Sequence, residues 1–372
     1  MVQYRRRPRI FRKYDFDRDF GEQPRLLEIQ LGYGLVPLAE ESKGEYLLKE
    51  ISYSRNLIEM EYGIPIPAVR ICDNMSLEPY EYSILFNGFE NGKNNIRLSF
   101  HLCLDTGLVN TPLECDYWDK VKDPAFGIDG FLIPDDEVDK YIKAGYKCIP
   151  PEKLIGTHLT EIIKKHRTKI LDQNMVNTLV EKVRKNNPDV ISDVFFYHQF
   201  TMSNMKILLN CLLAEEVSIR DMNTILETIA DYIQEDKTPF VLAERVRERL
   251  AYLIIKKYVD KKNKIHLISV SQGLSEYLKE IMHNSNSKVD TPYLLIESEV
   301  REKLIEKIAE RIEEPIKNGI YPVFVVTSSI RIAFAKFIHE ELPFIGVISD
   351  KELYVVKKEV DIENEGDLML DD

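Results

Sequence analysis

The stretch from Pro151 to Tyr232 constrains the fold of this chain most, because its apolar residues repeat with the period of amphipathic helices. Thr157 and Ser218 are candidate helix N-caps within it. The helix predicted after Ser218 carries apolar residues at i, i+3, i+4 and i+7, a spacing that lines one face. These residues are Met222, Ile225, Leu226, Ile229 and Ile233. The polar residues of the stretch form no reactive constellation, so it is more typical of a docking surface than of a catalytic site.

The residues before this stretch predict small mixed modules. Residues 26–38 begin with strand-like alternation, residues 43–61 fit a helix, and residues 68–71 and 80–86 have the pattern of strands. A helix followed by two strands is typical of a compact α+β module. Asp123-Pro-Ala-Phe-Gly127 predicts a turn that leads into a strand at 130–133, a short helix at 135–144 and a strand at 146–149. Pro150-Pro151 marks a boundary.

The residues after the stretch predict a different architecture. Thr238-Pro239 places a cap and a proline at the start of a long helix. Apolar runs of strand length then follow at 265–270, 322–326 and 344–348, and helical patterns at 274–282, 300–316 and 330–341 alternate with them. This order predicts an open α/β layer.

Charge and composition exclude several classes of protein. The formal net charge of -12 argues against a general nucleic-acid binder, which needs a basic face. No run of about 18 apolar residues is long enough to span a membrane. Met1 is followed by basic residues without an apolar stretch, so we expect no signal peptide. The basic N-terminal arm is either a solvated tail or a linker just inside a membrane, and charge alone leaves both readings open.

The five cysteines predict reduced thiols in a cytosolic protein rather than a disulfide framework. Their number is odd, their spacing is wide, and no C-x-x-C pair occurs. They are Cys72, Cys103, Cys115, Cys148 and Cys211.

The sequence matches no catalytic template, and we predict no catalytic, metal-binding or cofactor-binding residues. Residues 88–94 superficially resemble a phosphate loop, but three residues instead of four separate the glycines, and Asn94 stands where Ser or Thr is needed. A hairpin turn is the better interpretation. His158 near a predicted helix start has the features of a general base, yet no nucleophile accompanies it, so a structural histidine is favoured.

Five blocks, in order along the chain, resemble the cytoplasmic half of the FHIPEP family, the export gate proteins of flagellar and injectisome type III secretion. The form of the last block is closer to the flagellar branch. The resemblance covers roughly residues 22–355. The blocks are Leu31-Gly-Tyr-Gly-Leu-Val-Pro-Leu38, Val69-Arg-Ile-Cys-Asp-Asn-Met75, Asp123-Pro-Ala-Phe-Gly127, Gly156-Thr-His-Leu-Thr-Glu161 and the run from Leu212 to Glu227.

The resemblance implies a non-enzymatic docking platform at the cytoplasmic face of the bacterial inner membrane. An N-terminal membrane half with several transmembrane helices precedes this part in the family. The expected partners are flagellar export chaperones with their substrates, other export-apparatus proteins, and further copies of the chain in a ring that is nonameric in the family. Export there is powered mainly by the proton-motive force.

The resemblance and the sequence pattern together predict an α+β protein of four subdomains: two small α/β modules with the second inserted in the first, a helical subdomain and a C-terminal open α/β layer. The predicted boundaries are a basic linker at 1–21, subdomain 1 at 22–39 and 89–151, subdomain 2 at 40–88, subdomain 3 at 152–260, subdomain 4 at 261–356 and an acidic tail at 357–372.

The family binds its chaperone–substrate complexes in a hydrophobic dimple between the first two subdomains. Alignment through Asp73-Asn74 places the family's acidic position at Glu61, its aromatic position at Ile64 and a third contact near Asn95. Tyr62 and Ile64 would present apolar area to the partner while Glu61 orients it. The alternative is that Ile64 simply packs the module. Residues 98–122 depart from the family pattern.

Two other functions remain open at this point. The same architecture would serve the export gate of a virulence injectisome. A more distant alternative is an α/β enzyme of unknown activity, in which Thr327-Ser328-Ser329 at a strand end would bind an anion.

Overall fold

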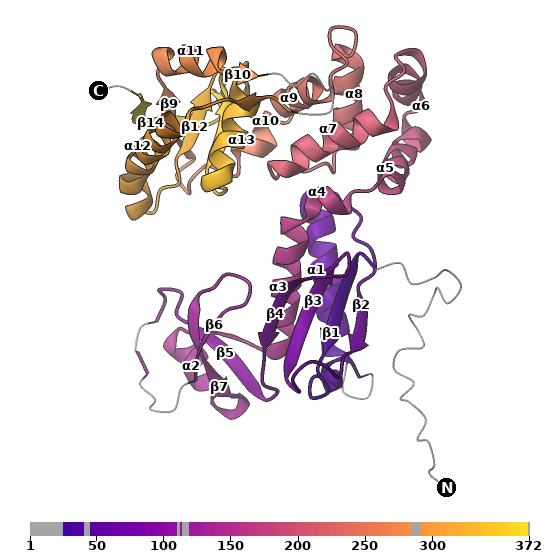
Figure 1. Cartoon of the computed structure of the whole chain (residues 1–372), viewed down its shortest axis with the longest axis vertical. Helices are drawn as coiled ribbons and strands as arrows, with labels where there is room; N and C mark the ends of the chain where they lie inside the picture. The colour runs from indigo at the N-terminus through magenta and orange to yellow at the C-terminus, as the bar shows by residue number, and fades with distance from the viewer. Residues whose placement is uncertain (1–24, 41–44, 110–111, 114–118, 284–290, 371–372) are drawn as a thin grey trace. The chain divides into compact units, whose positions relative to one another are not determined.

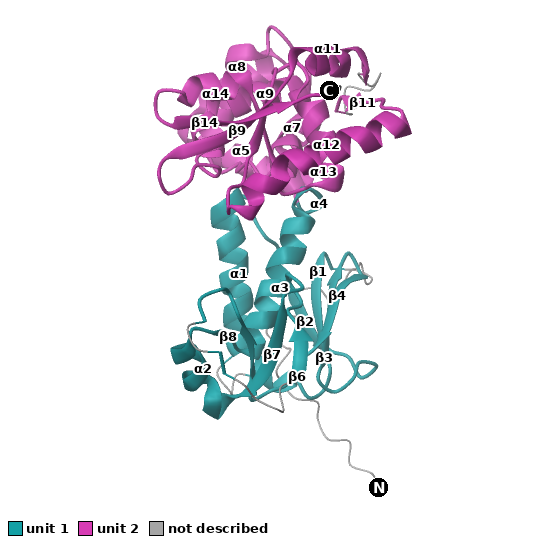
Figure 2. Ribbon diagram, turned by 90° about the vertical axis from the view of Figure 1, so that its left-hand side faces the viewer, with its two compact units in different colours: residues 1–170 teal, residues 171–372 magenta. Residues whose placement is uncertain are grey.

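The computed structural model describes residues 25–40, 45–109, 112–113, 119–283 and 291–370. The chain forms two compact units, residues 1–170 and 171–372 (Figure 2). The predicted basic linker at 1–21, Cys115 and part of the atypical segment 98–122 lie outside the described residues. Among the described helices, none combines the length and apolarity that a bilayer crossing requires.

Unit 1 contains two four-stranded sheets (Figure 1). In the first, β1 pairs parallel to β2 and antiparallel to β3, and β3 continues through a hairpin into β4. The second sheet is antiparallel and has the order β6-β7-β5-β8. The first sheet comprises β1 (Leu27–Leu31), β2 (Arg70–Asp73), β3 (Glu81–Phe86) and β4 (Phe89–Asn95). The second comprises β5 (Phe100–Leu104), β6 (Asp119–Lys122), β7 (Asp129–Pro134) and β8 (Lys147–Ile149).

These pairings correct the predicted subdomain boundaries. The prediction inserted residues 40–88 into a module formed by 22–39 and 89–151, but β1 lies in one sheet with β2 and β3. Leu27, Ile29 and Leu31 of β1 are fully buried, and strands from both sides of the predicted boundary flank them. The inserted module is instead residues 96–150, which form the second sheet and α2 (Val138–Ala144).

Two helices complete the first module of unit 1. The first is α1 (Tyr46–Tyr62), and the second is α3 (Pro151–Lys165), which follows the inserted module. They pack against each other where Gly156 of α3 meets α1. A Cβ at Gly156 would lie 2.5 Å from Cγ of Glu50, so any larger residue here would have to displace the Glu50 side chain. The Ser54 hydroxyl donates to the Gly156 carbonyl at 3.2 Å across the same contact.

Two predicted helix caps are wrong. The helix α3 begins at Pro151, so Thr157 lies inside it and donates its hydroxyl to the Lys153 carbonyl. The N-cap of α8 (Met222–Tyr232) is Asp221, whose carboxylate accepts the Thr224 amide at 3.0 Å. The Ser218 hydroxyl accepts the Arg220 amide just before it. Helix α9 does begin with Pro239 after Thr238, as predicted.

Unit 2 joins helices to an α/β layer. The layer is a parallel sheet with the order β13-β12-β9-β14, and β9, β12 and β13 lie where the sequence pattern predicts strands. The helices before it are α5 (Gln173–Asn186), α6 (Pro188–Ile191), the π-helical turn η5 (Ser192–Tyr197), α7 (Met202–Ala214), α8, α9 (Pro239–Arg249) and α10 (Ala251–Ile255). The layer contains β9 (Lys264–Val270), α11 (Gln272–Glu280), α12 (Ser298–Lys317), β12 (Val323–Val326), α13 (Arg331–Glu341), β13 (Gly346–Ser349), α14 (Asp350–Val356) and β14 (Asp361–Leu368).

Half of the predicted acidic tail at 357–372 is a strand. Residues Asp361–Leu368 form β14, which pairs parallel to β9 with an irregularity between Asn364 and Gly366. Side chains also meet across the two strands, because the Glu363 carboxylate lies 2.7 Å from the Lys264 ammonium and the Glu365 carboxylate lies 2.6 Å from the His266 ring. The acidic residues therefore belong to the C-terminal layer.

The prediction that all cysteines are reduced is wrong for two of them. Cys103 of β5 and Cys148 of β8 are register partners and form a disulfide, with their Cα atoms 4.2 Å apart. Cys72 and Cys211 are free, as predicted, and burial raises the pKa of each to about 12. Both free thiols therefore stay protonated and unreactive at neutral pH.

Candidate docking site

The four residues of the predicted site do not form one surface. Glu61 is exposed, and its carboxylate lies 3.6 Å from the Lys164 ammonium. Tyr62 and Ile64 are buried, with 2% and 0% of their surface exposed. Asn95 is exposed at the end of β4, and its side-chain amide donates to Glu78 at 2.8 Å. The apolar surface predicted from Tyr62 and Ile64 is therefore absent, because both side chains pack inside unit 1.

The end of α1 explains the burial of Ile64. The helix ends at Gly63, whose φ of 79° is left-handed and turns the chain back under the helix. Side chains of α1 then hold the returning segment: Arg55 donates to the Ile66 carbonyl at 2.6 Å, and Glu59 accepts the Ile66 amide at 2.9 Å. Residues 64–66 thus become part of the core.

A shallow pocket lies where the two sheets of unit 1 meet α3, and Asn95 lines it. We call it the junction pocket. Its volume is about 30 Å³, room for about two water molecules, so it fits the tip of a side chain and not a small-molecule ligand. Apolar groups from both sheets and from α3 form much of its wall. The lining residues are Asn94, Asn95, Ile96, Arg97, Phe100, Leu102, Val121, Lys122, Pro124, Leu132, Pro151 and Leu154.

The turn Asp123-Pro-Ala-Phe-Gly127 forms one rim of the junction pocket through Pro124. The buried Asp123 carboxylate accepts the amides of Ala125 at 3.0 Å and Phe126 at 2.7 Å, and its carbonyl accepts the Gly127 amide at 2.8 Å. This rigid turn leaves Phe126 58% exposed and the following Ile128 45% exposed. An aromatic side chain held in solvent by a fixed turn is a ready anchor for a partner.

Phe126 was not among the residues predicted for the docking site. The turn was predicted, and its motif contributed to the family resemblance, but nothing in a single sequence says whether its aromatic residue points inward or outward. One signal for its exposure was available in the sequence. Phe126 lies in a tight turn between Asp123 and Gly127, where residues are usually polar, so an aromatic residue there is unusual.

Charges around the junction pocket are paired. The Arg97 guanidinium contacts Asp119 at 2.5 Å and lies 5.7 Å from the centroid of the Phe100 ring. Lys122 contacts Asp129 at 3.1 Å on the neighbouring strand. Both pairs are exposed, so they contribute little stability and remain available to polar groups of a partner.

His158 is a structural histidine, as predicted. Its Nδ1 lies 2.8 Å from the Tyr82 hydroxyl inside unit 1, and its ring is 8% exposed. Burial lowers the pKa of His158 and raises that of Tyr82, so both groups are neutral at pH 7. This pair ties α3 to β3. Residues 88–94 are confirmed as part of a hairpin between β3 and β4.

The proposed anion site in the C-terminal layer is occupied by the protein itself. The Ser328 amide donates to the Asp350 carboxylate at 2.9 Å, and the hydroxyls of Thr327 and Ser329 lie 3.2 Å apart. A second anion would meet this carboxylate. The enzyme alternative therefore loses the one feature that supported it.

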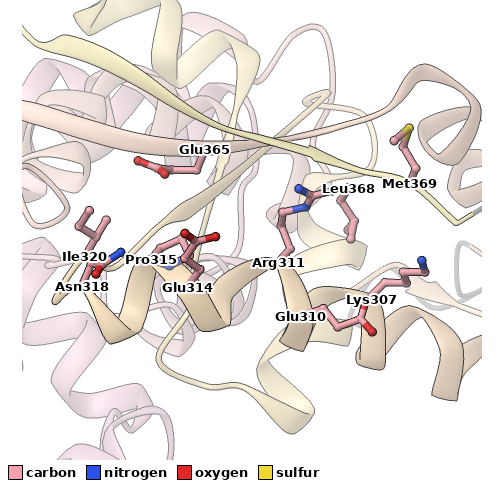
Figure 3. A pocket seen from close by; sticks show the side chains of 10 residues that line it. All are labelled: Lys307, Glu310, Arg311, Glu314, Pro315, Asn318, Ile320, Glu365, Leu368 and Met369. Carbon is pink, nitrogen blue, oxygen red and sulfur yellow. The ribbon is translucent and has the colours of Figure 1, made fainter. Parts of the chain in front are cut away.

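A second cavity, larger than the junction pocket, lies in unit 2. It has a volume of about 410 Å³ and lies between α12 and β14 (Figure 3). Lys307 and Arg311 face it together with Glu310, Glu314 and Glu365. None of its lining residues is a histidine, cysteine, serine or threonine. Within the described parts of the chain, no group of three His, Cys, Asp or Glu residues has metal-binding geometry.

Comparisons with known proteins agree with this architecture. The model of the FHIPEP family matches residues 19–358. Curated relatives named flagellar biosynthesis protein FlhA are 31% identical: that of Borreliella burgdorferi over 327 residues and that of Treponema pallidum over 330. Each alignment covers 88% of this chain and 46% of the relative. The chain thus spans less than half the length of the relatives it matches.

Solved structures with the same fold are more distant in sequence. The Chlamydia pneumoniae CdsV protein superposes with a TM-score of 0.78 at 23% identity, covering 95% of this chain and 99% of CdsV. The nonameric SctV-C of EPEC superposes with a TM-score of 0.73 at 18% identity, covering 94% and 100%. At these identities the likeness establishes the fold alone.

Proposed function

Because this chain belongs to the FHIPEP family, we propose that it is the docking part of a flagellar type III protein export gate. In this role it binds export substrates and chaperone–substrate complexes before their export. It acts at the cytoplasmic face of the bacterial inner membrane, below a membrane part of the same protein. The sequence relatives named FlhA favour a flagellar gate over an injectisome.

The exposed Phe126 beside the junction pocket is the observation that carries the docking role. Phe126 and Ile128 supply apolar area, and the pocket receives the tip of one partner side chain. Asn95 and the paired charges of Arg97 and Asp119 supply polar contacts at the rim. Apolar anchors surrounded by polar groups are the usual anatomy of a protein interface.

The small size of this site suits a transient partner. A pocket of about 30 Å³ buries little area, so the affinity stays modest and cargo is released readily. A deep, fully apolar groove would hold cargo too long for export.

We propose that the chain also assembles into a ring of identical copies. The solved SctV-C and EscV domains with this fold are described as nonameric. CdsV has been solved in complex with CdsO, which favours a further export-apparatus protein as a partner of this chain.

A binding experiment tests the docking site. The chain is immobilised, and its affinity for purified flagellar chaperone–substrate complexes is compared with that of Phe126→Ala and Asn95→Arg variants. We expect both variants to bind at least about tenfold more weakly, because each removes an anchor or fills the pocket rim. Phe89→Ala is the matched control, since Phe89 is 76% exposed at the other end of β4.

The results of this experiment distinguish the two candidate positions of the docking site in unit 1, the junction pocket and the end of α1. Full binding by both Phe126→Ala and Asn95→Arg would exclude the junction pocket. Loss of binding in Glu61→Lys alone would return the site to the end of α1. An Ile64→Ala variant is not informative here, because Ile64 is buried and its loss destabilises unit 1.

A further inference from the structure

Helices α10 and α14 pack side by side in unit 2 and expose four large apolar side chains. Tyr252 and Leu253 of α10 are each 52% exposed, while Tyr354 and Val355 of α14 are 68% and 53% exposed. Each helix buries its opposite side, through Ala251, Ile254 and Ile255 on α10 and through Glu352 and Val356 on α14. We call these four exposed side chains and the lysines around them the α10–α14 surface. Isolated exposed apolar residues need no explanation, but a group on two packed helices marks an interaction site.

Lysines are frequent on these two helices and in the residues that follow each of them. Seven lysines, all exposed, lie in residues 251–262 and 350–360. Three exposed carboxylates lie in the same segments, namely Asp260, Asp350 and Glu359. The lysines are Lys256, Lys257, Lys261, Lys262, Lys351, Lys357 and Lys358. The surface is therefore basic in a chain whose formal net charge is -12.

Two of these three carboxylates, Asp260 and Asp350, accept hydrogen bonds from backbone amides. Asp260 accepts the amides of Lys262 at 2.7 Å and Lys264 at 2.9 Å. Asp350 accepts the amides of Ser328 at 2.9 Å and Lys351 at 3.0 Å. These carboxylates cap turns and helix starts, while the Lys351 ammonium lies 3.5 Å from the Glu248 carboxylate of α9.

Charge and apolar area occur together on this surface. The Lys357 ammonium lies 3.6 Å from the centroid of the Tyr354 ring, a cation–π contact. A partner that covers Tyr354 must therefore also meet the lysine charge. Its most favourable chemistry is apolar side chains flanked by carboxylates.

We infer that the α10–α14 surface binds an acidic amphipathic segment of a protein partner. The apolar residues of that segment cover Tyr252, Leu253, Tyr354 and Val355, and its carboxylates meet the surrounding lysines. An anionic membrane fits less well, because membrane-binding helices insert one long apolar face and α10 and α14 span only five and seven residues. This surface lies in unit 2 and shares no residue with the junction pocket, so it is a second docking site that does not rest on the first.

A labelled acidic peptide with leucine and glutamate heptads serves as the probe, and a leucine–lysine peptide of equal length is its control. Fluorescence anisotropy measures binding to the full chain. We expect the acidic peptide alone to bind, and its affinity to fall at least about tenfold in Lys357→Glu/Lys358→Glu and in Tyr354→Ser. Lys303→Glu on α12 and Tyr321→Ser, which alter another exposed lysine and another exposed tyrosine, should leave it unchanged.

Salt and lipid controls complete the test. Binding of the acidic peptide should weaken as NaCl rises, since part of it is electrostatic. No binding of the acidic peptide, or equal binding by the parent and the α14 variants, would overturn the inference. The chain is also sedimented with vesicles of phosphatidylcholine and phosphatidylserine, and with vesicles of phosphatidylcholine alone. If it binds only the vesicles that contain phosphatidylserine, and the α14 variants abolish this binding, the surface is a membrane site and the inference is overturned.

Discussion

At the scale of single residues, unit 2 depends on a group of buried charges. Arg331 is fully buried and donates to Glu215 at 2.5 and 2.8 Å and to Glu244 at 2.5 Å. Arg247 lies 3.2 Å from Glu215 and 2.9 Å from Glu352. These residues come from helices on both sides of the boundary between the helical part and the α/β layer. Loss of Glu215 removes the carboxylate that both buried arginines contact, which is costly.

The pH dependence of stability should reveal Glu215. Burial raises the pKa of its carboxyl group, but Arg247 and Arg331 outweigh burial and lower it to about 2. A carboxyl with a lowered pKa stabilises the folded state above its unfolded pKa and loses that contribution as pH falls toward the folded value. We expect a Glu215→Gln variant to be less stable by about 3 kcal/mol at pH 7, with the difference vanishing between about pH 4.5 and 2.

Urea unfolding at several pH values measures this difference. Glu244→Gln is the comparison, because burial raises the pKa of Glu244, so its ionisation opposes folding and the stability difference caused by its loss should change with pH in the opposite sense. A constant difference between the parent and Glu215→Gln from pH 7 to pH 3 would contradict the assignment.

At the scale of elements, the helices and strands were largely predictable, but their partners were not. The apolar period of β9, β12 and β13 is visible in the sequence, and their parallel order follows from the helices between them. The pairing of β1 with strands from beyond α1 has no local signal, so the predicted insertion was misplaced. The acidic composition of β14 hid this strand from prediction, because its partners Lys264 and His266 lie on a strand about 100 residues earlier in the chain.

The candidate site was harder to predict than the fold. Asn95 does line the junction pocket. Tyr62 and Ile64 were expected at the surface, but the reversal at Gly63 buries Ile64, and nothing in the local pattern distinguishes a docking isoleucine from a core one. Phe126 shows the opposite case, an apolar residue whose exposure depends on hydrogen bonds of the turn.

The disulfide between β5 and β8 should stabilise the inserted module. It joins residues that are 45 positions apart. A cross-link that closes a loop of this length restricts the unfolded chain and raises the free energy of unfolding by about 4 kcal/mol. We expect dithiothreitol to increase hydrogen exchange of the β5 and β8 amides, and a Cys103→Ala/Cys148→Ala variant to show the same increase without reductant.

Cys72→Ala controls for the loss of a thiol, because Cys72 is unbonded. Identical exchange in oxidised and reduced protein would mean that the bond adds nothing to the module.

At the scale of the whole molecule, each unit has its own core. In unit 1 the buried set includes Leu27, Ile58, Tyr82, Ile84 and Leu159, which come from both the sheet and the two helices. In unit 2 a separate cluster surrounds Phe324 and Phe334. The two candidate binding surfaces are therefore carried by separately packed parts.

We expect residues 22–170, produced alone, to fold cooperatively. A unit with its own core can form an independent domain. Thermal unfolding followed by circular dichroism should give one sharp transition, with residues 171–372 produced alone as the comparison. A broad, non-cooperative melt of residues 22–170 would show that this unit needs the rest of the chain.

The pairing of β14 with β9 sets an order of events during synthesis. Lys264 and Glu363 are 99 residues apart, so β9 leaves the ribosome long before the strand that covers its edge. Unit 1, whose last residue is 170, is complete while most of unit 2 is still untranslated. Until β14 emerges, the nascent layer exposes the edge of β9 to pairing with other strands.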